Sequence, residues 1–159
     1  MFSKEKNIFS VNPDKASSRV MLSSTMLSVL FFVLTLILAS GPGNFSRPVM
    51  IQIVLAIPFL YVSILAYTKI AYKQDNYLWD LLGWSSVSMG NSLVLNAIGL
   101  MIALIDWPLA VTYFVTLIVL MFLYSAINVY YTRLWGVKVF KFLFFVLAWL
   151  IGGIWPLFF

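Results

Sequence analysis

The polar side chains best placed to do chemistry in this chain recur at steps of three and four residues within one apolar stretch. A helix brings residues at this spacing onto one face. In a bilayer, small residues on such a face let another helix approach closely, while Ser and Asn side chains hydrogen-bond across the contact. The residues at this spacing are Ser85, Ser88, Ser92, Asn96, Gly99 and Ala103.

The same stretch admits a second interpretation, a polar pathway or substrate site lined by Asn91 and Asn96. An amide inside hydrocarbon is costly without a hydrogen-bond partner. We favour helix packing, because the next apolar stretch carries side chains that could be the partners. A tight turn between the two stretches makes them antiparallel, which places Asn128 near the depth of Ser85 and Ser88. The expected partners are Thr112, Thr116, Ser125, Asn128 and Thr132.

Cysteine and histidine are absent, and this narrows the chemistry further. Without Cys the chain cannot run thiol redox chemistry or form a disulfide. Without Cys and His it lacks the usual protein ligands for zinc, haem and iron–sulfur clusters, so we predict no metal and no cofactor. No acidic residue falls at the centre of an apolar stretch, and a serine nucleophile would find no base there. Since no catalytic or nucleotide-binding motif is present either, we expect that the protein is not an enzyme.

Five long apolar stretches carry these residues. Hydrophobic residues make up 63% of the 159 and charged residues only 9%, which argues against an ordinary soluble domain. Each stretch is close to the about 20 residues that a helix needs to cross about 30 Å of hydrocarbon. Asp106, Trp107 and Pro108 separate the third stretch from the fourth. The sequence therefore predicts an all-α, polytopic integral membrane protein with spans at 20–39, 49–71, 87–105, 109–131 and 139–158.

The basic residues predict how these spans are oriented. Of the ten Lys and Arg residues, nine would lie at one membrane surface and only Arg47 at the other. Because loops rich in Lys and Arg stay on the cytoplasmic side, we expect the amino terminus inside and the carboxyl terminus outside. The net charge of +5 is scattered over the ends of apolar stretches. This pattern favours contacts with anionic lipid, at about 1 kcal/mol each, and argues against nucleic acid as a partner.

Outside the spans, the chain has room for little more than one terminal segment and one loop. We divide it into an interfacial segment, residues 1–19, and a five-helix transmembrane domain, residues 20–159. Asn12, Pro13 and Asp14 suit a helix start, since the missing N–H of proline costs nothing in a first turn. The alternative is a solvated tail. The first apolar run, at about twenty residues, exceeds the roughly 7 to 15 of a signal peptide, so we expect it to be retained as a span.

Two further segments have patterns of their own. Residues 75–84 place aromatic and aliphatic side chains at helix spacing and Asp80 among the polar positions. This predicts a short amphipathic helix in the cytoplasmic interface, and the alternative is a juxtamembrane loop with aromatic anchors. In the last span, Gly152 and Gly153 permit a close helix approach or a local irregularity.

Three stretches resemble the Yip-domain membrane proteins, a family named for interaction with Ypt/Rab GTPases. FSVNPDKASSRV is similar to the short Pro-containing segment that leads into the first span of that family. DNYLWDLLGWSSVSMGNSLVLNAIGLMIAL is similar to its amphipathic lead and small-residue third span, and FLYSAINVYYTRLWGVKVFKFLFFVL to the basic elbow between its last two spans. The resemblance implies five spans with the amino terminus in the cytoplasm and the carboxyl terminus outside. It carries over no functional residues.

These features lead us to expect a non-enzymatic integral membrane protein that acts by helix packing and lateral association, as a scaffold, assembly or membrane-organising component. The alternative is a small oligomeric transporter or channel with a polar pathway along the third span. Under either interpretation, we expect the protein in the cytoplasmic membrane of a bacterium or archaeon. Its partners would be the lipid bilayer and either another membrane protein or a second copy of the chain. The residues that we predict for packing or pathway are Ser85, Ser88, Asn91, Ser92, Asn96, Gly99, Ser125 and Asn128.

Overall fold

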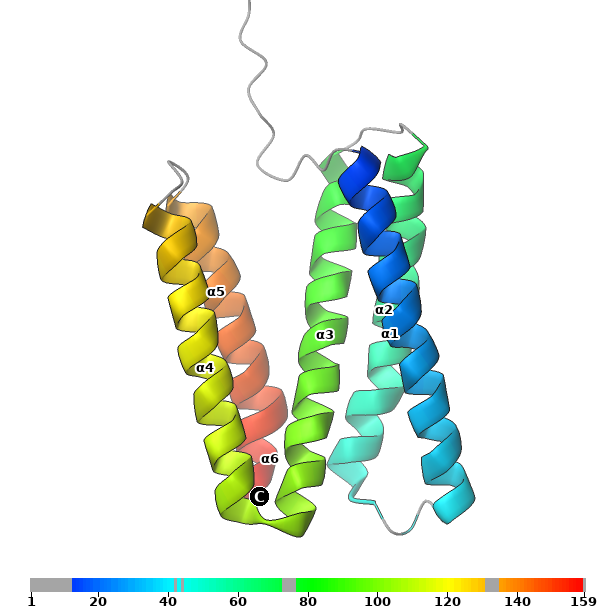
Figure 1. Ribbon diagram of the computed structural model, residues 1–159, viewed down its shortest axis with the longest axis vertical. Coiled ribbons are helices and arrows are strands. Elements are labelled where there is room, and N and C mark those ends of the chain that lie inside the picture. The colour runs from blue at the N-terminus through cyan, green and yellow to red at the C-terminus, as the bar shows by residue number, and fades with distance from the viewer. Residues whose placement is uncertain (1–12, 42, 44, 73–76, 131–134, 159) are drawn as a thin grey trace, which may run out of the picture.

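The computed structural model of this chain describes residues 13–41, 43, 45–72, 77–130 and 135–158. Within these residues the fold is a bundle of long helices (Figure 1). The last three elements follow one another without a gap: an α-helix, a π-helical segment and a short α-helix. We call these three elements together the fifth rod. The helices are α1 (Pro13–Ser40), α2 (Arg47–Ala71), α3 (Tyr77–Ile105), α4 (Trp107–Tyr130), α5 (Trp135–Trp149), η2 (Leu150–Ile154) and α6 (Trp155–Phe158).

Five helical segments in the described part of the chain are long and apolar enough to cross a membrane. The predicted all-α, five-span fold class is therefore confirmed. The first helix, α1, begins at Pro13, in agreement with the predicted helix start, and runs without a break into the first span. Residues 1–12 of the predicted interfacial segment lie outside the described residues.

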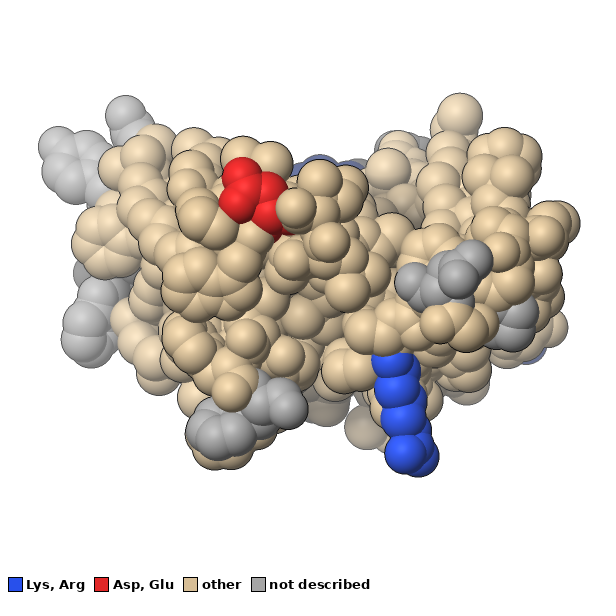
Figure 2. Space-filling model, turned by 90° about the horizontal axis from the view of Figure 1, so that it is seen from below, with Lys and Arg blue, Asp and Glu red and all other residues tan. Residues whose placement is uncertain are grey.

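Successive helices run in opposite directions, so the connections alternate between the two ends of the bundle (Figure 1). The start of α1, the end of α2 and the start of α5 lie at one end, which we call the basic end. At the opposite end α1 stops before Gly41, whose φ of 94° favours glycine. This opposite end carries Arg47 and Asp106 and is otherwise sparse in charge (Figure 2). The described basic residues of the basic end are Lys15, Arg19, Lys69, Lys138 and Lys141.

The helices form two groups that meet at α3. The first group, α1 to α3, packs around an apolar core, and the contact between α2 and α3 is the most extensive. Gly90 lets α3 approach α2, because a Cβ there would lie 2.9 Å from the Leu60 side chain. The second group, α4 and α5, diverges from α3 toward the basic end (Figure 1). The apolar core consists of Leu30, Ile37, Val49, Ile53, Ala56, Leu60, Leu93, Ala97 and Leu100.

The segment predicted as an interfacial helix is helical, but it is not a separate element. Residues 77–84 form about the first two turns of α3, which continues to Ile105, and residues 75 and 76 lie outside the described residues. Asp80, expected at a polar position, is only 1% exposed, whereas Leu78 is 66% exposed. The register of the helix explains this, because Asp80 lies one turn before Gly83, and Gly83 faces Tyr67 of α2.

The last span contains a local irregularity, which is one of the two alternatives predicted from its two glycines. Residues Leu150–Ile154 form the π-helix η2, and the N–H of Trp155 donates to Leu150 O, five residues back. A π-helical turn of this kind is rare and is found frequently at functional sites. Its position therefore marks where a candidate site can be sought.

Candidate functional site

A polar junction joins the two helix groups at η2. Gln52 Nε2 of α2 donates a hydrogen bond to Gly152 O over 2.8 Å, and Asn96 Nδ2 of α3 donates to Ala148 O over 3.1 Å. Both amide side chains are buried. Backbone that leaves regular α geometry in lipid must be satisfied by neighbouring helices, and here the two amides do this. We call Gln52, Asn96, Ala148 and Gly152 the amide junction.

Phe114 of α4 fills the space beside the amide junction. Its side chain is buried between α3 and η2, since a Cβ at either Gly99 or Gly153 would overlap its ring. A Cβ at Gly153 would also lie 2.7 Å from Asn96 Oδ1. A Cβ at Gly152 would lie 3.1 Å from Gln52 Nε2. The missing side chains of these three glycines therefore allow α3, α4 and η2 to meet.

The hydrogen bonds expected between the third and fourth spans do not involve the described Thr side chains. Thr112 and Thr116 donate instead to backbone carbonyls of α4 itself, over 2.9 and 2.8 Å. A Thr hydroxyl in a helix can reach the carbonyl four residues back without help from a neighbour. Tyr113, which the sequence did not single out, donates from its hydroxyl to Leu95 O of α3 over 3.2 Å. Of the other expected partners, the side chain of Asn128 and the whole of Thr132 lie outside the described part of the chain.

The predicted stripe of α3 is buried through its middle. Ser88, Ser92, Asn96 and Gly99 are all buried, while Ser85 is partly exposed and bonds within its own helix. The two amides considered for a pathway have different surroundings. Asn96 belongs to the amide junction, whereas Asn91 lines a cavity together with Ser125 of α4.

Gln52 is the member of the amide junction that the sequence analysis did not single out. It is the one Asn or Gln in the apolar stretch 49–71. An amide at that depth is costly in lipid unless it is bonded, so its isolation was a usable signal. Its partner, Gly152, lies in the last span and could not be inferred from spacing.

A cavity of about 510 Å³ lies between the two helix groups near the basic end. Two basic side chains line it, Arg19 from α1 and Lys141 from α5. Arg19 donates a hydrogen bond to the Tyr67 hydroxyl, and its Cζ lies 5.0 Å from the Tyr67 ring centroid. Lys141 Nζ lies 4.9 Å from the Trp84 ring centroid, which is a cation–π distance. We call this cavity the basic cleft.

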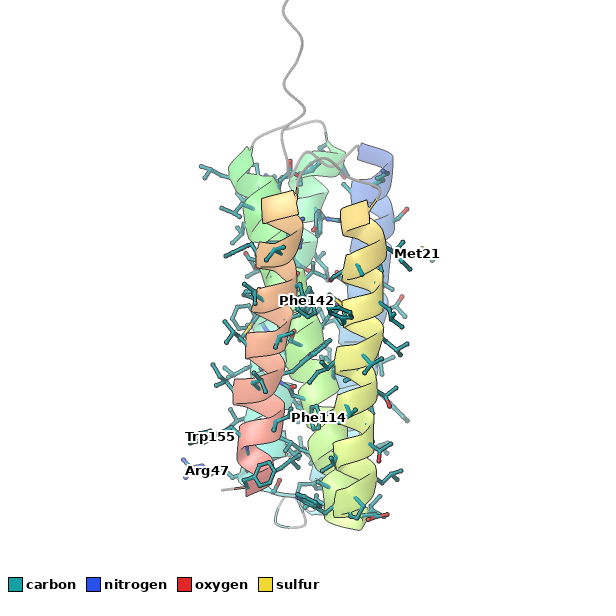
Figure 3. The ribbon with its side chains drawn as sticks, turned by 90° about the vertical axis from the view of Figure 1, so that its left-hand side faces the viewer. Met21, Arg47, Phe114, Phe142 and Trp155 are labelled. Carbon is teal, nitrogen blue, oxygen red and sulfur yellow. The ribbon has the colours of Figure 1, made fainter. Side chains whose placement is uncertain are left out.

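The rest of the basic cleft is polar at a few points and largely apolar elsewhere. Asn91 and Ser125 are the predicted site residues that the fold brings together here. Leu22 and Phe142 belong to the apolar wall, and Figure 3 shows Phe142 in the half of the bundle nearer the basic end and Phe114 in the other half. No acidic side chain is among the described residues that line the cleft. The cleft therefore combines positive charge with an apolar surface.

No family model, no curated protein and no solved structure matches this chain. The resemblance to the Yip-domain family therefore stays a prediction. The described residues contain no group of His, Cys, Asp and Glu that could hold a metal ion. The features that bear on function are then the two helix groups, the amide junction and the basic cleft.

Proposed function

We propose that this protein is a non-enzymatic integral membrane protein that acts by helix packing and lateral association, as a scaffold, assembly or membrane-organising component. The uneven burial of its spans supports this proposal. In α2 and α3, 39% and 44% of the most apolar window is buried inside the protein, against 11% in both α4 and the fifth rod. The second helix group therefore leaves most of its surface to lipid or to another helix.

The outer surface of α4 suits contact with another membrane helix. Val115, Val119, Leu120 and Leu123 are each about half exposed, and α4 has no charged residue. Helices in lipid associate through close packing, so an apolar surface of this kind can pair with one of complementary shape. A second copy of the chain is the simplest partner that offers such a surface.

Cross-linking in the bilayer tests this proposal. The native chain has no Cys, so Val119→Cys places a single thiol on the outer surface of α4. If two copies associate through α4, oxidation in liposomes should join them into a covalent dimer even when protein is sparse. The matched control is Val54→Cys on α2, because Val54 and Val119 are both 50% exposed, and it should give far less dimer. Monomer alone from both variants would contradict association through α4.

A small oligomeric transporter or channel is the second candidate, and the basic cleft is the observation that favours it. Asn91 and Ser125 give the cleft a polar lining from two helices. A pathway would have to continue to the opposite end, where Phe114 fills the space between Gly99 and Gly153. Solute flux into liposomes that hold the purified protein separates the candidates. A scaffold predicts no flux above empty liposomes, and a flux that Asn91→Leu abolishes would favour the transporter.

We also propose that the basic end faces the cytoplasm of a bacterial or archaeal cell, because ends rich in Lys and Arg stay inside. Gly43 and Gly136 allow a clean test, since a Cβ at either position meets nothing within 4 Å. Gly43 belongs to the opposite end and Gly136 to the basic end. A membrane-impermeant thiol reagent should label Gly43→Cys in intact cells, and Gly136→Cys only after permeabilisation. The reverse labelling pattern would contradict this orientation.

A further inference from the structure

We propose that the basic cleft binds an anionic phospholipid, with the phosphate at its basic side chains and the upper acyl chain against its apolar wall. This site is independent of the lateral association proposed above. The cleft lies where α4 and α5 diverge from α3 toward the basic end (Figure 1). Its walls come from both helix groups, so the site exists only when the two groups are assembled.

The charge of the basic cleft selects an anion. Arg19 and Lys141 reach it from different helices. A guanidinium presents five N–H donors in a fork that matches phosphate, and an ammonium adds a compact charge. Asp80 acts electrostatically on Tyr67, as Arg19 does, so one carboxylate lies near one of the cations. Even with Asp80 ionised, two positive charges against one leave the site positive.

Aromatic contacts hold both cations at the cleft. Arg19 is fixed on Tyr67 by a hydrogen bond and a ring contact. Lys141 lies over Trp84, and the Trp84 ring packs in turn against Phe144 of α5 with centroids 5.6 Å apart. Side chains that are already ordered lose less freedom when a ligand binds. The cations are therefore placed for binding in the protein as it stands.

The order of side chains along α3 matches the order of groups in a phospholipid. Trp84 and Asn91 are seven residues apart, which is about 10 Å along a helix axis. We place Lys141, which lies beside Trp84, at the level of the lipid phosphate. Asn91 then lies deeper in the bilayer, toward the glycerol and the acyl chains. Asn91 Oδ1 is buried and has no hydrogen-bond partner in the described part of the chain. This oxygen can only accept a hydrogen bond, and the phosphate and esters of a phospholipid have no donor, so the Nδ2 group of the same amide is the part that suits a lipid ester carbonyl.

The apolar wall distinguishes a lipid from a soluble anion. Leu22, Val87, Met121, Phe142 and Phe145 line the same cavity as the two cations. Inorganic phosphate would leave this wall uncovered, whereas an acyl chain would cover it. A cavity of about 510 Å³ suits a head group and the upper part of a chain. The remainder of the lipid would lie in the surrounding bilayer.

Binding of phosphatidylglycerol to the detergent-solubilised protein tests the proposal, with phosphatidylcholine as the lipid without net charge. A basic side chain contributes about 1 kcal/mol, or about fivefold in affinity, so Arg19→Gln combined with Lys141→Gln should weaken phosphatidylglycerol binding about thirtyfold. The matched control combines Lys15→Gln with Lys69→Gln. It removes the same charge from two exposed positions of the basic end that do not line the cleft, and should leave the affinity nearly unchanged.

Two more variants test whether the lipid occupies the cleft itself. Arg19→Lys keeps the positive charge, so it should retain most of the affinity for phosphatidylglycerol. If the loss in the Gln variant came from a folding defect at this position, Arg19→Lys should lose affinity as well. Ser125→Phe fills the cleft with both cations intact, and should weaken phosphatidylglycerol binding strongly in protein that elutes as the native chain does. Unchanged binding in the double Gln variant or in Ser125→Phe would overturn the proposal. Inorganic phosphate that binds as tightly as phosphatidylglycerol would also overturn it, because the site would then belong to a soluble anion.

Discussion

A Gly153→Leu variant is expected to lose about 3 kcal/mol of stability, because the new side chain has no space in a packed contact. A Cβ at Gly153 would overlap the Phe114 ring and lie 2.7 Å from Asn96 Oδ1. Both neighbours are buried, at 1% exposure each, so neither has room to move aside. The expected result is separation of α4 and α5 from α3. Unfolding of the protein in mixed micelles with rising SDS, followed by tryptophan fluorescence, measures the loss.

Gly136→Leu is the matched control for this variant. A Cβ at Gly136 meets nothing within 4 Å, so the same substitution should stay within about 0.5 kcal/mol of the native protein. The cause can be tested by adding Phe114→Ala to Gly153→Leu, because the shortened side chain makes the space that Leu needs. We expect the double variant to cost less than the sum of the single ones. Native stability of Gly153→Leu, or strict additivity, would show that this contact does not join the helix groups.

The five spans were predictable from the sequence because a single large cost determines them. Backbone polar groups cannot be left unsatisfied in hydrocarbon, so an apolar run of sufficient length must form a helix. The break at Asp106 needed no knowledge of packing, since the charge and Pro108 both oppose a helix that continues through it. The irregularity at Gly152 and Gly153 was predictable for a similar local reason, because two adjacent glycines weaken a helix.

The buried face of α3 was predictable, but the elements that cover it were not. The spacing of Ser88, Ser92 and Asn96 places them on one face, and the structure buries all three. Chain order suggested α4 as the partner, yet the Asn96 amide bonds to the fifth rod. A periodic pattern predicts that one face of a helix is buried, but it does not indicate which other helix covers that face. The role of Phe114 could not be predicted either, because the chain has 14 Phe residues and nothing in the sequence distinguishes this one.

The basic cleft lay beyond sequence reasoning for a further reason. Arg19 and Lys141 each lie at the end of an apolar stretch, where a basic residue is already explained by membrane orientation. Their shared cavity depends on the divergence of two helix groups toward the basic end (Figure 1). The close contacts at Gly99 and Gly153 lie near the other end of the same helices, where the two groups meet. The spacing of basic residues along the sequence contains nothing about this arrangement.

Loss of both amides from the amide junction is expected to cost about 3 kcal/mol, since one carbonyl in η2 and one at the end of α5 lose their side-chain donors together. Gln52→Leu or Asn96→Leu alone should cost about 1 kcal/mol, the usual range for one hydrogen bond between membrane helices. The two amides bond to Gly152 and Ala148, four residues apart in the same rod. When one amide is lost, the other still holds this part of the rod in place. The combined loss should therefore exceed the sum of the single losses.

Unfolding of the two single variants and the double variant in SDS gives the coupling between the amides directly. Thr116→Leu is the matched control, because the Thr116 hydroxyl is exposed and bonds within α4, so its replacement should change stability little. A double variant that costs no more than the two single losses added would mean that each amide holds its own helix independently. The π-helical segment would then be a consequence of its glycines alone. A surplus of about 1 kcal/mol would instead establish the amides as a pair that clamps the fifth rod to α2 and α3.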